Sequence, residues 1–269
     1  IFQPSEETIN GALSMIASGA LENPNVDEVI GLHTGNIWDG LEPGQIGWRT
    51  GPMMAATSTL AIVFEGRGGH GATPHLTVDP IVIATEAIGQ LQTLVSREIS
   101  PFEPAVLTIG KIAGGTAPNV IAGSCELRGT IRSFNPKIDA FLKKRIRETV
   151  EGVAASMRGR GTVSFSADIP AVINVEACVL KMRDIVAKTL GEKWVKEIAL
   201  PSSGAEDFAF YLEKVPGAFF YHCATFEPSP DGTERNYPHH NSKFDVNESV
   251  LWTGSAAMAA YALNWQGWK

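Results

Sequence analysis

The stretch SCELRGTIR, residues 124–132, alternates strictly between two kinds of side chain. One set is small or apolar and the other is polar: Cys125, Leu127, Gly129 and Ile131 against Glu126, Arg128, Thr130 and Arg132. Because successive side chains of a strand point to opposite faces, this period predicts a β-strand with one face on a core.

Strand and helix signals follow one another on both sides of this stretch. Strand periodicity marks residues 57–65 and 105–112 before it and residues 162–166 after it. Two helices are each announced by a capping residue followed by proline, at Asp79-Pro80 and Asn135-Pro136. The order is β-α-β-β-α-β, which predicts a ferredoxin-like α+β domain over residues 55–169.

The flanking segments have a different, α/β texture. Residues 9–20 keep helical spacing, and Val29-Ile30-Gly31-Leu32-His33 is typical of a short buried strand that ends at His33. Helices are predicted over residues 175–190, 205–213 and 248–263, and a buried strand over 217–223. The predicted fold class is therefore α/β, with a larger domain made of residues 1–54 and 170–269 and interrupted by the α+β domain.

Composition excludes several classes of function. The net charge of the 269-residue chain is -7, without a basic stripe, which argues against a nucleic-acid partner. No run of about 18 apolar residues appears, so no membrane span is predicted. The three cysteines are far apart and form no CxxC pair. They are typical of reduced thiols, and a cytoplasmic location is expected.

Residues able to bind metal occur near the predicted element ends of the α/β part. They are the adjacent Glu6 and Glu7, His33, and the His239-His240 pair. Carboxylate oxygen and imidazole nitrogen are ligands of zinc, manganese and cobalt. The spacing matches no compact motif such as HExxH, so simpler interpretations stay open. The glutamates could stabilise a helix N-terminus by about 0.3–1 kcal/mol, and His33 could be a hydrogen-bonded core histidine.

Six motifs in order give the sequence a resemblance over essentially its whole length. They are FQPSEE (2–7), GLH (31–33), GGHGATPH (68–75), GGTAPNVI (114–121), GAEDFA (204–209) and YPHHNSKFD (237–245). Together they resemble the metal-dependent N-acyl-amino-acid amidohydrolases of peptidase family M20, which include aminoacylases, hippurate hydrolases and auxin-conjugate hydrolases. The resemblance implies a three-layer α/β/α catalytic domain with an inserted ferredoxin-like lid that forms a homodimer. It also implies two divalent metal ions, zinc, manganese or cobalt, in each intact site and a small N-acyl amino acid as substrate.

The resemblance also implies roles for individual residues. Glu6 matches the general base, and Glu7, His33 and His240 match metal ligands, whereas His239 is expected only to form hydrogen bonds. His70 matches a lid histidine that assists the substrate carbonyl in the partner subunit's site. Substrate contacts are expected from Asn119, from Arg132, which suits a carboxylate, and from Gly204. A simpler interpretation remains for some positions. Glu206-Asp207 could be a helix start and nothing more, and Arg132 could belong to a solvated strand face.

One departure from the family pattern affects the expected activity. Family members supply a cysteine and a histidine ligand from a GCGHD-type motif upstream of FQPxEE, and this sequence has no such motif. We therefore expect that the chain begins inside a catalytic-domain strand, has an incomplete metal shell, and alone hydrolyses N-acyl amino acids negligibly. Two alternatives stay open: a diaminopimelate-type deacylase or carboxypeptidase of the same superfamily, and a non-catalytic dimerisation or binding module.

Overall fold

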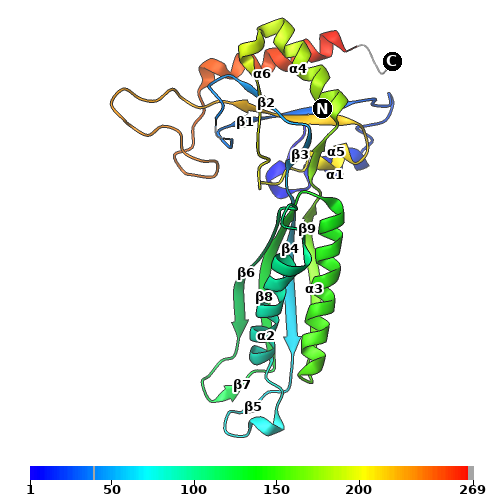
Figure 1. The fold of residues 1–269 in the computed structure, drawn as a ribbon, viewed down its shortest axis with the longest axis vertical. Helices are drawn as coiled ribbons and strands as arrows, with labels where there is room; N and C mark the ends of the chain where they lie inside the picture. Colours follow the sequence, from blue (N-terminus) through cyan, green and yellow to red (C-terminus); the bar gives the residue numbers. More distant parts are fainter. Residues whose placement is uncertain (39, 266–269) are drawn as a thin grey trace. The chain divides into compact units, whose positions relative to one another are not determined.

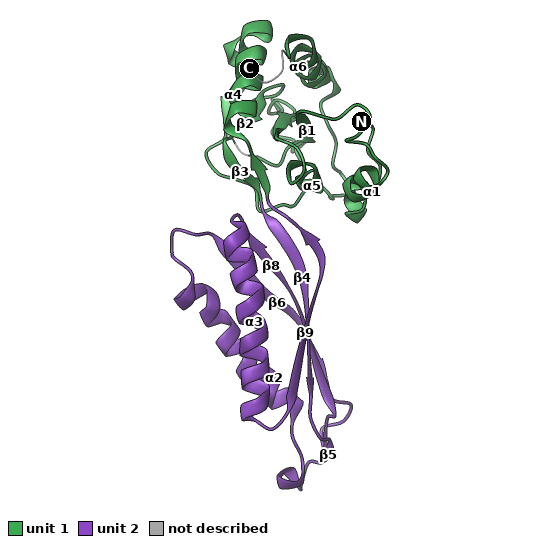
Figure 2. Cartoon of the chain, turned by 90° about the vertical axis from the view of Figure 1, so that its right-hand side faces the viewer, with its two compact units in different colours: residues 1–54, 172–269 green, residues 55–171 purple. Residues whose placement is uncertain are grey.

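The computed structural model describes residues 1–38 and 40–265, and the chain divides into two compact units. Unit 1 comprises Ile1–Met54 and Val172–Lys269, and unit 2 comprises Ala55–Ala171, as coloured in Figure 2. The chain leaves unit 1 through strand β3 (Gly51–Met54) and returns through β10 (Val172–Asn174). These two strands pair antiparallel, and the single continuous segment between them forms unit 2.

Unit 1 is built on a four-stranded mixed sheet with the order β1-β12-β2-β11. Its strands are β1 (Val29–Gly35), β12 (Gly217–Cys223), β2 (Ile46–Trp48) and β11 (Val195–Glu197). All seven residues of β12 are buried, which explains its continuous apolar sequence. β1 and β12 are parallel, with His33 beside Tyr221, so their carboxyl ends lie at the same edge of the sheet.

Helices cover both faces of this sheet (Figure 1). Helices α4 (Glu176–Leu190) and α6 (Leu251–Asn264) pack on one face, in a core with Ala218 and Phe220. Helices α1 (Gly11–Ala17) and α5 (Ala209–Leu212) lie on the other face, where the rings of Phe208 and Phe219 are 5.0 Å apart. Unit 1 is therefore a mixed α/β structure in which helices flank a sheet.

Two helices of unit 1 are shorter than their sequence patterns predict. The pattern predicts a helix from residue 9, but Ile9 has a left-handed backbone with φ 63°, and α1 begins at Gly11. The helix predicted over residues 205–213 is reduced to the four residues of α5, because Asp207 and Phe208 form a turn before it. The predicted helix over 175–190 is confirmed as α4.

Unit 2 has a four-stranded antiparallel sheet with the order β6-β8-β4-β9. Its strands are β4 (Ala56–Glu65), β6 (Ala105–Gly114), β8 (Ser124–Ser133) and β9 (Arg160–Ile169). Helices α2 (Pro80–Thr93) and α3 (Pro136–Ser156) pack on one face, and the β-α-β-β-α-β order predicted from the sequence is confirmed. The side chains of Asp79 and Asn135 accept hydrogen bonds from Ile81 N–H and Lys137 N–H, as N-caps do.

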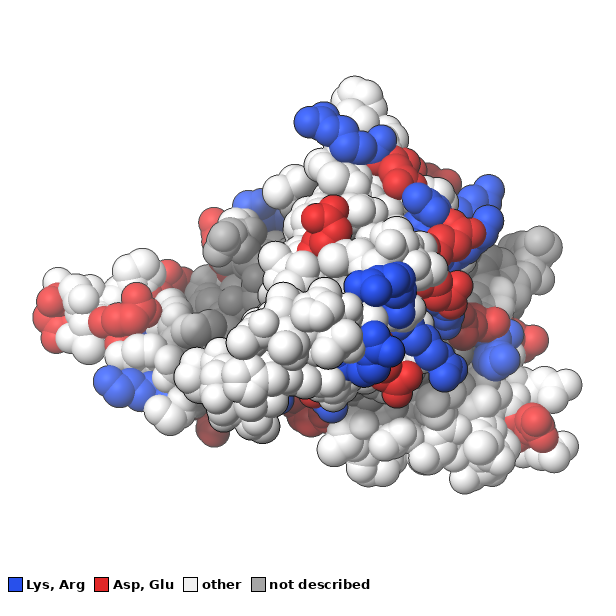
Figure 3. All heavy atoms as spheres, turned by 90° about the horizontal axis from the view of Figure 1, so that it is seen from below, with Lys and Arg blue, Asp and Glu red and all other residues white. Residues whose placement is uncertain are grey.

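The remaining elements are short. β5 (Gly69–His70) and β7 (Val120–Ile121) form a two-stranded ribbon. The single turns are η1 (Glu6–Thr8), η2 (Pro74–Leu76), η3 (Leu94–Glu98), η4 (Glu192–Trp194) and η5 (Glu248–Val250). Among the described residues, no helix is both long and apolar enough to cross a membrane. Basic and acidic side chains lie next to one another on the face seen in Figure 3.

Candidate active site

Glu6 and Glu7 lie in the turn η1, which two unusual backbone conformations enclose. Ser5 on one side has φ 61°, and Ile9 on the other has φ 63°. A left-handed backbone is rare for residues other than glycine and is an outlier for a β-branched one such as Ile9. Such conformations cost on the order of 1–3 kcal/mol each and persist only when surrounding contacts impose them. The position of the two glutamates is therefore imposed by contacts from elsewhere in unit 1.

His33 projects from β1 into an aromatic environment. Its ring stacks on that of Tyr221, with centroids 5.7 Å apart, and its centroid is 5.1 Å from that of His239. Within the described part of the chain, the buried Nδ1 of His33 has no hydrogen-bond partner. Burial, followed by the nearby His239, lowers the pKa of His33 to about 4. At neutral pH the imidazole is therefore uncharged and keeps a lone pair, as a metal ligand must.

The two adjacent histidines have different surroundings. His239 Nε2 accepts a hydrogen bond from Asn36 N–H at 3.2 Å. A Cβ on Gly35 would lie 1.9 Å from this nitrogen, so only glycine permits the approach. His240 is exposed, and its Nε2 lies 3.9 Å from Glu7 Oε2. The structure thus forms two pairs, His33 with His239 and Glu7 with His240, joined by the peptide bond between the histidines.

Three carboxylates form a second group beside these pairs. One oxygen each from Glu6, Glu206 and Asp207 lie within 4.8 Å of one another. Burial, followed by the charge of Glu6, raises the pKa of Glu206 to about 8. Burial, and then the charges of Glu7 and Asp207, raise the pKa of Glu6. A raised pKa brings Glu6 closer to the range in which a carboxylate serves as a general base at neutral pH.

Glu206 and Asp207, for which the sequence also allowed a simple helix start, lie beside Glu6 in the structure. Their exposed fractions are 6% and 0%. The available signal was the position of two consecutive acids between Ala205 and Phe208, in a segment with apolar neighbours on both sides. Charged side chains are almost never fully buried unless they are paired, hydrogen-bonded or functional.

An apolar cavity adjoins this part of unit 1. It has a volume of about 570 Å³, and its wall includes Gln3, His33, Glu206, Phe208 and Phe219. Ligand sites in proteins are commonly of this kind, mostly apolar with a few convergent polar groups. Gly204 is half-buried in the loop before Glu206, where its N–H donates to Ser202 Oγ at 3.0 Å.

Unit 2 brings together two of its three predicted site residues. His70 pairs with Val120 in the β5–β7 ribbon, and Gly71 N–H donates to Asn119 C=O at 2.8 Å, so His70 and Asn119 lie on neighbouring segments. Arg132 lies near the other end of β8 from Ser124, which pairs with Glu65 just before the ribbon. At about 3.3 Å per strand residue, Arg132 is roughly 25 Å from that end. One small substrate could not contact Arg132 and His70 of the same subunit.

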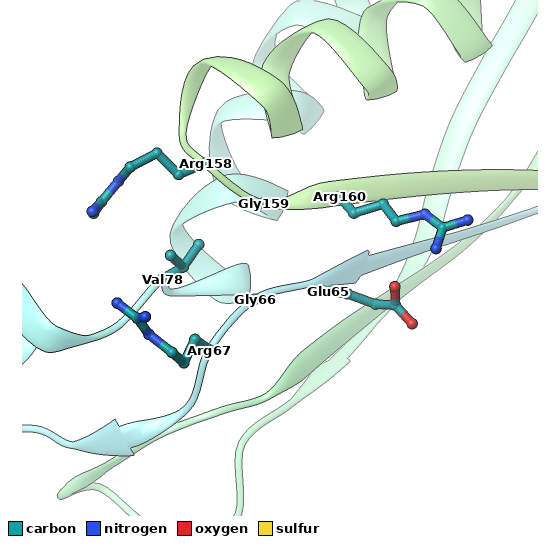
Figure 4. Close-up of a pocket in the computed structure, with 7 residues that line it drawn as sticks. All are labelled: Glu65, Gly66, Arg67, Val78, Arg158, Gly159 and Arg160. Carbon is teal, nitrogen blue, oxygen red and sulfur yellow. The ribbon is translucent and has the colours of Figure 1, made fainter.

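A further cavity of unit 2 contains none of the predicted site residues. It has a volume of about 540 Å³ and is drawn in Figure 4. Its charged residues are Glu65, Arg67, Arg158 and Arg160. Arg67 and Arg158 extend to the same side of Val78, whereas Glu65 and Arg160 point the other way.

Residues 1–264 match the family described as Peptidase family M20/M25/M40. The chain belongs to this family. This M20 chain is 36% identical over 93% of its length to the N-acetyl-L-cysteine deacetylase of Bacillus subtilis and 34% identical over 98% to thermostable carboxypeptidase 2 of Saccharolobus solfataricus. It also resembles a dinuclear metal-binding M20 peptidase of Bacillus subtilis, with a TM-score of 0.77, 29% identity and coverage of 97% of this chain and 63% of that one.

The M20 chain is shorter than these relatives. It spans 56% of the length of the deacetylase and 64% of that of the carboxypeptidase.

Proposed function

We propose that this M20 protein is a metal-dependent hydrolase that cleaves the amide bond of N-acyl-L-amino acids or similar small conjugates. The observation that carries the proposal is the pairing of Glu7 with His240 and of His33 with His239, in a part of unit 1 where His33 also lines an apolar cavity. The deacetylase name of one relative supports an N-acyl amino acid as the substrate class.

The site residues fit a divalent metal in their donor chemistry. Glu7, His33 and His240 are the proposed ligands, because the first offers a carboxylate and the other two offer imidazole nitrogens. The buried Nδ1 of His33, which has no partner within the described residues, is the kind of atom that a metal satisfies. Zinc, manganese and cobalt accept this donor set, and the dinuclear relative supports two ions in each intact site.

The proposed reaction is the attack of water on an amide carbonyl. A bound divalent metal would lower the pKa of its water toward about 7 and would polarise the carbonyl. Glu6 takes the proton of the water and then delivers it to the leaving amine. Its half-buried place suits this task, since burial, and then the charges of Glu7 and Asp207, raise the pKa of Glu6.

Residues of unit 2 are proposed to bind and polarise the substrate. His70 donates a hydrogen bond to the developing oxyanion in the partner subunit's site, and the neighbouring Asn119 contacts the same substrate. Arg132 holds the substrate carboxylate, for which its guanidinium fork is well shaped. Gly204 borders the substrate from the loop before Glu206. The separation of Arg132 from His70 along β8 supports a site shared between two subunits.

Homodimerisation through unit 2 is part of the proposal. Strand β6 lies at the edge of its sheet in the described part of the chain. It carries Val106 and Ile112 with exposed fractions of 47% and 51%. A ten-residue strand edge with exposed apolar side chains favours pairing with a second copy.

The test is a substrate panel with the metal-loaded full-length protein. N-acetyl and N-benzoyl amino acids should be hydrolysed, and the same compounds with an amidated carboxylate should lose most of their rate. Faster hydrolysis of dipeptides or N-acyl-diaminopimelate would favour the alternative of a carboxypeptidase or diaminopimelate-type deacylase, which the carboxypeptidase relative supports. If none of these compounds is hydrolysed, the result would favour the remaining alternative, a non-catalytic dimerisation or binding module.

A further inference from the structure

Asp207 is a buried carboxylate to which the proposed reaction gives no contact with substrate or metal. Its exposed fraction is 0%, and both of its oxygens accept hydrogen bonds. Oδ1 accepts from the side-chain amide of Gln3 at 2.7 Å, and Oδ2 accepts from Ala12 N–H at 3.0 Å. Gln3 precedes the turn that carries Glu6 and Glu7, and Ala12 follows it. One carboxylate therefore binds the chain on both sides of the two glutamates.

The two ends of this segment also touch each other. A Cβ on Gly11 would lie 2.0 Å from Pro4 O and 2.6 Å from Gln3 Nε2, so a side chain at residue 11 would force them apart. Residues 3–12 therefore form a closed loop. Gln3 and Pro4 form one end of this loop, and Gly11 and Ala12 form the other. Asp207 accepts a hydrogen bond from each end.

The inside of the loop supplies little to hold its shape. Within the turn, Thr8 N–H and Thr8 Oγ1 donate to Ser5 C=O at 3.3 Å and 3.1 Å, and Ile9 N–H donates to Glu6 C=O at 2.8 Å. Ser5 and Ile9 both have left-handed backbones, which the free chain avoids. A strained turn with few internal bonds keeps its shape only if its ends are fixed.

We infer that Asp207 is a positioning residue that closes the loop of residues 3–12 and so fixes Glu6 and Glu7 in the site. The inference rests on the proposed roles of these glutamates as base and metal ligand. It assigns Asp207 no contact with substrate or metal. A different role for Asp207 would be to stabilise the fold of unit 1 as a whole, without a specific effect on the loop.

The geometry predicts which substitutions close the loop and which open it. In Asp207→Asn, the amide oxygen still accepts from Ala12 N–H, and the amide NH₂ donates to Gln3 once the Gln3 amide is turned. In Asp207→Ala, both bonds are lost. Gln3→Glu keeps the buried Asp207 and its bond to Ala12 but sets a second carboxylate against it. Asp184→Ala is the control, because this acid is exposed on α4 of the same unit.

The experiment measures amide hydrogen exchange of residues 3–12 in the full chain, together with the zinc affinity of each variant. Asp207→Ala and Gln3→Glu should exchange at Ala12 at least tenfold faster than the parent and bind zinc at least tenfold more weakly. Asp207→Asn should restore both quantities to within about threefold, and Asp184→Ala should match the parent. A purely structural role would instead accelerate exchange throughout unit 1, including β12.

The outcomes separate this inference from the proposed function. Parent-like exchange at Ala12 in Asp207→Ala, or equal damage from the asparagine and alanine variants, would overturn it. If Asp207→Ala does not fold, Gln3→Glu decides: faster exchange confined to residues 3–12 supports the inference, and parent-like exchange overturns it. A parent that shows the predicted exchange pattern but hydrolyses no N-acyl amino acid would refute the proposed function and leave the positioning role standing.

Discussion

The adjacent residues Glu6 and Glu7 have unequal surroundings, and this inequality separates their proposed roles. Glu6 is half-buried against Glu206 and Asp207, where burial raises its pKa. Glu7 is exposed and faces His240. A base benefits from a raised pKa, whereas a ligand must reach the metal as a carboxylate. A role limited to stabilising a helix N-terminus would not require the two neighbouring acids to have such different surroundings.

The histidine pair supports a prediction at the level of single residues. His239 Nε2 already accepts a hydrogen bond from Asn36 N–H, whereas His240 is exposed beside Glu7. His240→Ala should therefore weaken zinc binding by at least tenfold, and His239→Ala should weaken it by less than His240→Ala does. Isothermal titration of both variants with zinc measures the difference. A larger loss in His239→Ala would transfer the ligand role to that residue.

The buried Glu206 should make the stability of the metal-free chain depend on pH. Its pKa is raised from 4.5 to about 8, mainly by burial. Between these values the folded chain keeps a proton that the unfolded chain has lost, so stability falls as pH rises, by about 1.4 kcal/mol per pH unit from this group. The contribution is fully present below pH 4.5 and is gone above pH 8.

Glu206→Gln cannot ionise and resembles the protonated acid. The midpoint temperature of thermal unfolding should therefore be higher for Glu206→Gln than for the parent at pH 8–9, and the two temperatures should be close near pH 4.5. The exposed Glu213→Gln serves as the control. Parallel pH curves for Glu206→Gln and its parent would contradict the assignment of a buried, protonated Glu206.

Sequence patterns predicted only some of the residues of the candidate site. The motif order indicated Glu6, Glu7, His33 and His240, because each belongs to a distinctive local stretch. The burial of Glu206 and Asp207 was not predicted, because it arises when residues 3–12 fold onto a segment almost two hundred positions away. Periodicity describes neighbours along the chain and contains no information on such a contact.

At the scale of elements, helix α3 ends in a motif with an unusual residue. Arg158 N–H donates to Ala155 C=O and Gly159 N–H donates to Ala154 C=O, which is the hydrogen-bond pattern of a Schellman motif. The left-handed position of this motif normally holds glycine, and here Arg158 occupies it with φ 66°. Its side chain is exposed at the wall of the cavity of Figure 4, so no packing requires an arginine there.

Arg158→Gly should therefore stabilise the chain, by about 1 kcal/mol, since glycine adopts the left-handed conformation without strain. Arg160→Gly is the matched control in the extended strand β9, where glycine should instead cost about 0.5–1 kcal/mol. Urea unfolding of both variants tests the contrast. Equal destabilisation by the two substitutions would contradict the account of this helix end.

Element prediction succeeded where the local signal was strong. The caps at Asp79 and Asn135 and the alternation in residues 124–132 correctly indicated α2, α3 and β8. The predicted bounds of α1 and α5 were less accurate. Ile9 and Asp207 fit the helical spacing, but Ile9 lies in the loop of residues 3–12 and Asp207 is hydrogen-bonded to that loop, so neither is helical. The order of the four-stranded sheet of unit 1 was not predicted, since β2 and β11 have only three residues each and show no period.

At the scale of the whole molecule, unit 2 should fold by itself. Its main core cluster is drawn entirely from residues 60–154, with Val163 and Phe165 packed against it. Its ends are close together, because Thr57 pairs with Ile169. A protein of residues 55–171 should give dispersed amide resonances and a cooperative thermal transition. Leu127→Ala, which removes a fully buried side chain, should destabilise it by roughly 2–5 kcal/mol. A non-cooperative melt of the unaltered segment would contradict an independent core.

The central claim is that Glu6 acts as a base beside a metal that other residues hold. The most direct measurement compares Glu6→Gln with Glu7→Gln in the full-length protein, recording zinc content and the turnover of an N-acetyl amino acid together. Glu6→Gln should keep the parent's zinc content and lose at least a hundredfold in kcat, whereas Glu7→Gln should lose zinc and activity in step. Near-normal turnover by zinc-loaded Glu6→Gln would contradict the account.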